Sequence, residues 1–109
     1  MANTFKNKVA DLGNSADTAV YTCPASTTAI IVHCQVANID GTNAADLYMD
    51  LFDTSASAAK ALAHEISVPA DSALNPIGGK LVLEAGDELR AWAGAASDLE
   101  ITLGILQIT

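Results

Sequence analysis

Apolar and polar side chains alternate with a period of two along most of this chain. In the segment 30–37, one face carries Ile30, Val32, Cys34 and Val36, and the residues between them point the other way. The same alternation runs through 47–52, 62–68 and 99–105. Successive side chains of a β-strand point to opposite faces, so this period predicts half-buried strands.

Clusters of Gly, Pro, Asn, Asp and Ser separate the alternating segments, at intervals typical of a sandwich or a small barrel. The pattern predicts about eight strands, over residues 4–10, 18–23, 28–38, 45–53, 60–68, 80–84, 87–95 and 99–108. We therefore expect an all-β fold, an antiparallel β-sandwich that is jelly-roll-like, with residues 1–109 as a single domain.

Three local features bear on this prediction. The segment 58–63 is rich in Ala and favours a helix in isolation, but the period of two over 62–68 favours a strand. Gly86 can supply the positive φ of a tight hairpin between two apolar strands. Gly104 lies inside the last strand, where glycine often marks a bulge or a close backbone approach.

The alternation also predicts which side chains form the core. The expected members are Val32, Cys34, Val36, Leu47, Met49, Leu51, Leu83, Leu89, Ile101 and Leu103.

Composition and charge narrow the class of protein. The 109 residues hold 13 acidic and 5 basic side chains, which gives a net charge of −8. Half of the residues are apolar, too high a fraction for a disordered chain. A surface of this charge repels a phosphate backbone, so we expect no direct nucleic-acid partner.

The first residues contain Lys6 and Lys8 but no apolar stretch behind them, so we expect no secretory signal. No apolar run approaches the ~20 residues of a membrane helix. We expect a protein kept in a cytosol-like compartment, without a membrane partner.

The two cysteines, Cys23 and Cys34, are compatible with a disulfide, a redox pair or half of a metal site. Their spacing is not that of a CxxC motif, and no second pair completes a zinc site. We therefore expect two buried, reduced thiols that act as small hydrophobic side chains.

Candidate chemistry is sparse. His33 is expected on the face opposite the core, and His64 on the apolar face of its strand, where a pairing with Cys34 is a minor alternative. The densest acidic cluster is Asp46, Asp50 and Asp53, and the third points away from the other two. The loop 40–43 offers oxygens to calcium but too few ligands for a dedicated site.

No phosphate-binding loop or hydrolase motif is present, so we expect neither enzymatic activity, cofactor nor metal. Arg90 and Trp92 share one face of their strand and form a candidate surface patch. As the only Trp of the chain, Trp92 is more often a core or interface anchor.

Several stretches stand out by their order and spacing: VYTCPA at 20–25, AIIVH at 29–33, VANID at 36–40, VPA at 68–70, GKLVLEAGD at 79–87 and LQIT at 106–109. Together they resemble a family of small β-sandwich virion structural proteins of tailed bacteriophages. Cys23 departs from the pattern, because an aliphatic residue is expected there.

The resemblance implies a structural role in the virion, with assembly in the host cytoplasm and no catalytic residues. It is compatible with a capsid decoration (cement) protein that binds the major capsid protein, as a homo-oligomer and most often a trimer. A tail or neck ring component is the alternative. A carbohydrate-binding module that uses Tyr48, Arg90 and Trp92 is a third hypothesis.

The segment 1–8 is the candidate contact with the capsid. Lys6 and Lys8 supply two of the five basic residues, and Phe5 supplies an apolar anchor. The segment is expected to be either an arm that reaches the shell or an edge strand with a frayed end.

Overall fold

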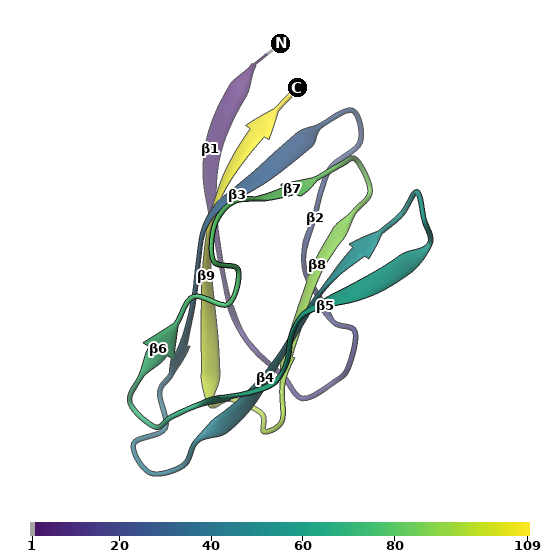
Figure 1. The fold of residues 1–109 in the computed structure, drawn as a ribbon. Coiled ribbons are helices and arrows are strands. Elements are labelled where there is room, and N and C mark those ends of the chain that lie inside the picture. Colours follow the sequence, from purple (N-terminus) through teal and green to yellow (C-terminus); the bar gives the residue numbers. More distant parts are fainter. Residues whose placement is uncertain (1) are drawn as a thin grey trace.

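The computed structural model describes residues 2–109, which form two antiparallel sheets packed face to face and contain no helix (Figure 1). The all-β sandwich predicted from the alternation is therefore confirmed. No helix that could cross a membrane occurs in this part of the chain. The strands are β1 (Asn3–Asp11), β2 (Ala19–Thr22), β3 (Thr28–Asn38), β4 (Ala45–Asp53), β5 (Ala58–Val68), β6 (Ala73–Leu74), β7 (Leu81–Leu83), β8 (Glu88–Ala93) and β9 (Leu99–Ile108).

The strand order is that of a jelly roll. Sheet A has the order β1-β9-β3-β6, with β7 also paired to β3, and sheet B has the order β2-β8-β4-β5. Most consecutive strands therefore lie in opposite sheets, as in two interleaved Greek keys. The sequence pattern missed β6, which pairs through only Val36 with Leu74 and Ala37 with Ala73.

The segment 3–11 is an edge strand. It pairs with β9 along its whole length, from Asn3 opposite Ile108 to Asp11 opposite Glu100. Backbone hydrogen bonds between Ala2 and Thr109 continue this pairing and place the two ends side by side. This segment was expected to be either an arm that reaches the shell or an edge strand, and the structure shows the edge strand. Met1 lies outside the described residues.

The core lies between the two sheets and consists almost entirely of aliphatic side chains. Leu47 and Met49 from sheet B are fully buried against sheet A, and so are Leu89 and Val68. Sheet A contributes Ile31, Cys34, Val36, Leu83, Leu99, Ile101, Leu103 and Ile105. Leu51, predicted in the core, is half-buried and packs against it.

Val32 was predicted in the core and is instead 39% exposed. The register between β3 and β9 shifts between Ile31 and His33, where β3 has one extra residue in a β-bulge. Odd-numbered side chains therefore face the core before the bulge, and even-numbered side chains face it afterwards. Ile31 and Cys34 both point into the core, while Val32 and His33 are both exposed.

Gly104, predicted to mark a bulge, lies opposite this irregularity. A Cβ at Gly104 would lie 3.3 Å from the Cβ of His33 and 3.5 Å from Cγ2 of Val32. Glycine at this position therefore leaves room for the bulge of the neighbouring strand.

A second irregularity overturns the placement of His64 on an apolar face. The segment 58–68 is a strand, as expected from its period, but its register with β4 shifts between Leu47 and Met49. Glu65 has a φ of 53°, which interrupts the alternation of inward and outward side chains along β5. Ala63 faces the core before this point and Val68 faces it after. The side chain of His64 is 75% exposed, which excludes its pairing with the buried Cys34.

The turn 84–87 was predicted to close a hairpin, but it carries the chain from sheet A to sheet B. β7 pairs with β3, whereas β8 pairs with β2 and β4. Gly86 has the positive φ expected, 88°. The buried carboxylate of Asp87 accepts hydrogen bonds from the backbone N–H groups of Glu84, at 2.9 Å, and Thr54, at 3.0 Å.

Neighbouring loops are tied to the same turn. The backbone N–H of Cys23 donates to the carbonyl of Asp87 at 2.9 Å, and the N–H of Gly86 donates to the carbonyl of Cys23 at 2.9 Å. The hydroxyl of Thr54 donates to the carbonyl of Gly86 at 2.6 Å. The connections β2–β3, β4–β5 and β7–β8 therefore meet at one corner.

Asn38 organises the opposite end of β3. Its Nδ2 donates to the carbonyls of Val68, at 2.9 Å, and Asn43, at 3.0 Å, and its Oδ1 accepts from the N–H of Asp40 at 2.8 Å. The side chain is buried, and these bonds satisfy its amide inside the protein.

We predict that Leu103→Ala lowers the free energy of unfolding by about 2–5 kcal/mol, because it leaves a cavity in a filled core. Thr102→Ala is the matched control, since Thr102 lies next to it on the exposed face of β9. Its expected effect is within about 0.5 kcal/mol. Urea unfolding followed by circular dichroism measures both, and equal effects would contradict the placement of the core.

Candidate functional site

Both cysteines are free and buried, as predicted. The thiol of Cys23 donates to the carbonyls of Thr27, at 3.3 Å, and Leu83, at 3.6 Å. Burial raises the pKa of the Cys34 thiol to about 11, and burial also raises the pKa of Cys23. Neither thiol has the lowered pKa of a nucleophile, so both belong to the packing of the sandwich.

Some of the acidic side chains accept hydrogen bonds that hold loops and turns. In the loop 40–43, the Asp40 carboxylate accepts from the backbone N–H groups of Thr42 and Asn43, and these bonds lower its pKa. Asp53, Glu84 and Asp87 bring carboxylate oxygens within 4.8 Å of one another. The sequence pattern did not predict this group, because Asp53 lies at the end of β4, far in sequence from Glu84 and Asp87. Both carboxylate oxygens of Asp87 already accept backbone hydrogen bonds, from Thr54 and Glu84, so we do not assign a metal site to these three residues.

The outer face of sheet A carries a continuous row of apolar side chains across four strands. Phe5 lies opposite Leu106, which lies opposite Ile30, which lies opposite Val82. Phe5 is 76% exposed and Val82 is 54% exposed, while Leu106 and Ile30 are half-buried. We call these four residues the apolar row.

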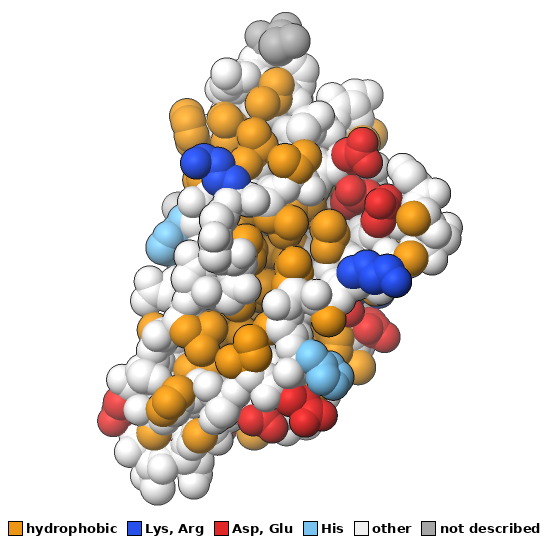
Figure 2. Space-filling model, viewed as in Figure 1, with side chains coloured by type: hydrophobic (Ala, Val, Ile, Leu, Met, Phe, Trp, Pro, Cys, Tyr) orange, Lys and Arg blue, Asp and Glu red, His pale blue; other side chains and the backbone are white. Residues whose placement is uncertain are grey.

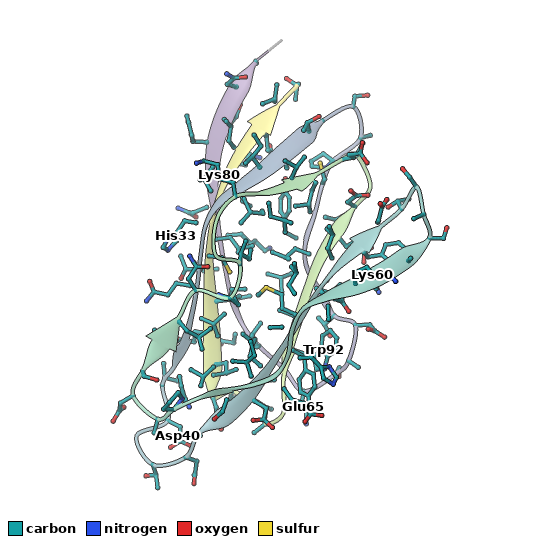
Figure 3. All side chains as sticks on the ribbon, in the orientation of Figure 1. His33, Asp40, Lys60, Glu65, Lys80 and Trp92 are labelled. Atoms are coloured by element: carbon teal, nitrogen blue, oxygen red, sulfur yellow. The ribbon has the colours of Figure 1, made fainter. Side chains whose placement is uncertain are left out.

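Other exposed apolar side chains, Val9 and Val32, extend this surface along β1 and β3. In the space-filling view, hydrophobic side chains gather near the chain ends, beside Lys80 (Figures 2 and 3). A row of large apolar side chains on the outside of a sheet exceeds the scattered exposure of an ordinary surface.

The three residues predicted to contact a partner all lie on β1. Phe5 joins the apolar row, whereas Lys6 and Lys8 lie opposite the inward-facing Ile105 and Leu103. Adjacent residues of a strand point to opposite faces, so the lysines do not share the face of Phe5. Both lysines are exposed at the edge of the sandwich, where β1 forms the border of sheet A.

The outer face of sheet B carries a row of aromatic side chains. Tyr48 on β4 lies opposite Trp92 on β8, with their rings stacked at 5.5 Å between centroids and 1° between planes. The ring of His64 on β5 meets Tyr48 edge-on at 5.5 Å and 83°. We call His64, Tyr48 and Trp92 the aromatic row. Figure 3 shows Trp92 and Glu65 on the outer side of sheet B, and His33 on the outer side of sheet A.

Arg90 and Trp92 share the outer face of β8, as the sequence predicted, and both are half-buried. Trp92 is therefore not a core residue. The guanidinium of Arg90 lies over the ring of Phe52, 4.2 Å from its centroid, and its Nε donates to Glu88 at 2.9 Å. These contacts hold Arg90 next to Phe52 rather than over the indole.

Asp50 lies on the same face, opposite Arg90 and between Tyr48 and Phe52 in the sequence. It is 9% exposed, and its Oδ1 has no hydrogen-bond partner among the described residues. Burial raises the pKa of this carboxyl, the Arg90 guanidinium lowers it, and the charges of Asp17 and Glu88 raise it.

Comparison with solved structures shows proteins of similar fold at low sequence identity. A chain of the T13 viral particle of infectious bursal disease virus matches with a TM-score of 0.54 and 6% identity, over 96% of this chain and 30% of that chain. This chain therefore spans less than a third of the length of that viral protein. No family model matches the sequence, and no curated protein is significantly similar to it.

Two further structures match over most of both chains. A protein of the disulfide-linked pili of Bacillus endospore appendages has a TM-score of 0.57 and 13% identity, over 98% of this chain and 88% of that one. The Drosophila NLP core, described in terms of pentamer formation and histone binding, has a TM-score of 0.53 and 11% identity, over 97% of this chain and 99% of that one. At these identities the shared property is the β-sandwich fold.

We predict that both thiols react slowly with a thiol reagent in the native protein and rapidly after unfolding, because burial keeps them protonated. Reaction with 5,5′-dithiobis(2-nitrobenzoic acid) at pH 8, with and without guanidinium chloride, measures this difference. A native protein lighter by two hydrogens in intact mass would instead show a disulfide.

We predict that Asp50→Asn raises the melting temperature at pH 7. Because the pKa of Asp50 in the folded protein lies above its ordinary value of 3.8, stability is lost as pH rises from 3.8 through the folded-state pKa. Asn does not ionise, so the gain should vanish below pH 3.8. Asp46→Asn, which removes the same charge at an exposed position, is the control. A gain independent of pH, or equal in both variants, would contradict this origin.

Proposed function

We propose that this protein is a non-enzymatic structural protein of a virion, and specifically a capsid decoration protein. It binds the major capsid protein on the outer shell through the outer face of sheet A and stabilises neighbouring capsomers. The observation that carries the proposal is the apolar row, because Phe5 and Val82 remain exposed although both lie within paired strands.

The chemistry of this surface suits a protein partner. Binding energy in interfaces concentrates in a few large side chains at the centre of a desolvated patch, and the apolar row offers four in register. Phe5 stands at one end of the row, so β1 supplies both an anchor and an unpaired strand edge. An unpaired edge invites pairing with another chain unless it is covered.

Three other observations support a structural role. The turn motifs of the phage resemblance occupy the corner around Asp87 and Cys23, where they hold loops together rather than form a site. The fold occurs in a viral particle, in pili and in a pentameric protein, all of which are assemblies. The net charge of −8 suits a position outside the compartment that holds the nucleic acid.

Decoration proteins most often bridge capsomers at three-fold positions, so we propose a trimer on the shell. A tail or neck ring component is the second candidate, because the same apolar row and open edges would serve a ring of identical subunits. Copy number separates the two, since a decoration protein approaches the abundance of the major capsid protein and a ring component is far scarcer.

We predict that the double variant Phe5→Ser and Val82→Ser weakens co-sedimentation with empty capsids of the cognate phage about tenfold or more. Both side chains are exposed, so the variant should fold, which circular dichroism checks. Deleting 1–8 would be less informative, because it removes most of β1 and uncovers β9.

Ile39→Ser is the matched control, because Ile39 is 56% exposed but lies in the loop after β3, away from the row. Its binding to capsids should equal that of the unchanged protein. Undiminished binding by the double variant would refute the role of the apolar row. Absence of binding by the unchanged protein would favour the tail or neck position.

A further inference from the structure

The aromatic row on sheet B is not used by the proposed capsid contact, because it lies on the opposite outer face of the sandwich. Trp92, Tyr48 and His64 come from three neighbouring strands, so their backbones are fixed by the sheet. All three rings face away from the core, and the side chain of His64 is 75% exposed. This face therefore presents a rigid aromatic surface to solvent.

We propose that the outer face of sheet B binds a neutral saccharide, with Trp92, supported by Tyr48, as the stacking platform and Glu65 and Asp46 as acceptors for its hydroxyls. The proposal goes beyond the virion role and concerns a different surface of the molecule.

Stacking is the first requirement for such a ligand. The C–H face of a pyranose ring carries slight positive charge and fits the electron-rich face of an aromatic ring. Trp92 and Tyr48 stack with their planes at 1° and their centroids 5.5 Å apart, so Tyr48 supports one face of the indole and the sugar stacks on the opposite face. The ring of His64 packs against Tyr48 at 83°, so Tyr48 lies between two other rings. A platform ordered before binding loses little side-chain entropy when the ligand arrives.

Hydrogen-bonding groups beside the platform are the second requirement. Glu65 follows His64 on β5, its side chain is 60% exposed, and its Oε1 lies 3.8 Å from Nε2 of His64. Asp46 is exposed on β4, two residues before Tyr48 and on the same face. Ionised carboxylates are acceptors only, which matches the hydroxyl donors of a sugar.

The charge of this face sets the class of saccharide. Burial is the largest cause of the raised pKa of the Tyr48 hydroxyl, and the negative charges of Glu65 and Asp46 raise it further. Both charges therefore act at the platform. Arg90, the cation on β8, is already held by Glu88 and Phe52. An anionic sugar would meet repulsion here, so the face selects neutral sugars over uronic or sialic acids.

A purely structural role would make the aromatic row a cross-strand cluster that stabilises sheet B. That role changes the free energy of unfolding but produces no response to a sugar. Trp92 separates the two, because it is the only Trp of the chain and its fluorescence reports on the platform alone.

The test titrates the full chain with maltohexaose, cellohexaose, chitohexaose and mannohexaose, and with polysialic acid as the anionic comparator. We expect at least one neutral hexasaccharide to change the fluorescence of Trp92 saturably below about 1 mM, and polysialic acid to leave it unchanged. No response to any of the four at about 10 mM, by fluorescence or by titration calorimetry, would overturn the proposal.

Calorimetry with variants then tests the residues. Tyr48→Ala and Trp92→Ala should each weaken binding of the responding sugar about tenfold or more, whereas Trp92→Phe should retain most of the affinity. Phe5→Ala is the control, because it removes an exposed aromatic ring from the other sheet. Equal affinities in Trp92→Ala and Phe5→Ala would overturn the proposal.

The same variants keep the two functional claims distinguishable. Trp92→Ala should bind empty capsids as well as the unchanged protein does. The variant with both Phe5→Ser and Val82→Ser should retain sugar binding. Failure of one claim therefore leaves the other intact.

Discussion

The buried carboxylate of Asp87 holds the corner on which the two-sheet arrangement depends. Its oxygens accept one backbone N–H from its own turn and one from the β4–β5 turn, while its backbone is paired with Cys23. A jelly roll passes its chain from sheet to sheet repeatedly, and three of its connections meet at this point. A buried carboxylate without such donors would destabilise the fold, so the bonds fix both the turn and the spacing between the sheets.

Because aliphatic side chains fill the space between the sheets, the surfaces available for function are the outer faces and the edges. These faces differ in chemistry. Sheet A presents the apolar row and the strand edge of β1, which suit a protein partner that excludes water. Sheet B presents rings, carboxylates and a paired arginine, which suit a ligand that stacks and donates hydrogen bonds. On the side of the molecule visible in Figure 2, most of the acidic side chains lie toward sheet B.

The sequence was informative wherever the period of two held without interruption. It predicted the long strands, most of the core, the burial of both thiols and the shared face of Arg90 and Trp92. It failed at Val32 and His64, because a bulge in β3 and a register shift in β5 change the inward parity part-way along each strand. Gly104 was the only residue whose type indicated the bulge in β3. It predicted an irregularity near its own position but did not show that Val32 would turn outward.

Pairings between distant segments were beyond the sequence pattern. Alternation shows that Tyr48 and Trp92 point out of their sheet, but the stacking of their rings depends on β4 and β8 being neighbours. The apolar row likewise needs the register of four strands, two of them at opposite ends of the chain. The prediction of a hairpin at the turn 84–87 was wrong, because the local sequence indicates a tight turn but not which sheet the next strand joins.

Hydroxyl-radical footprinting of the free protein and of the protein bound to empty capsids measures the solvent accessibility of both outer faces in one sample. We expect Phe5, Leu106 and Val82 to lose most of their reactivity on the capsid while Trp92 and Tyr48 keep theirs. Protection of Trp92 and Tyr48 with Phe5 and Val82 still reactive would contradict the proposed contact through sheet A.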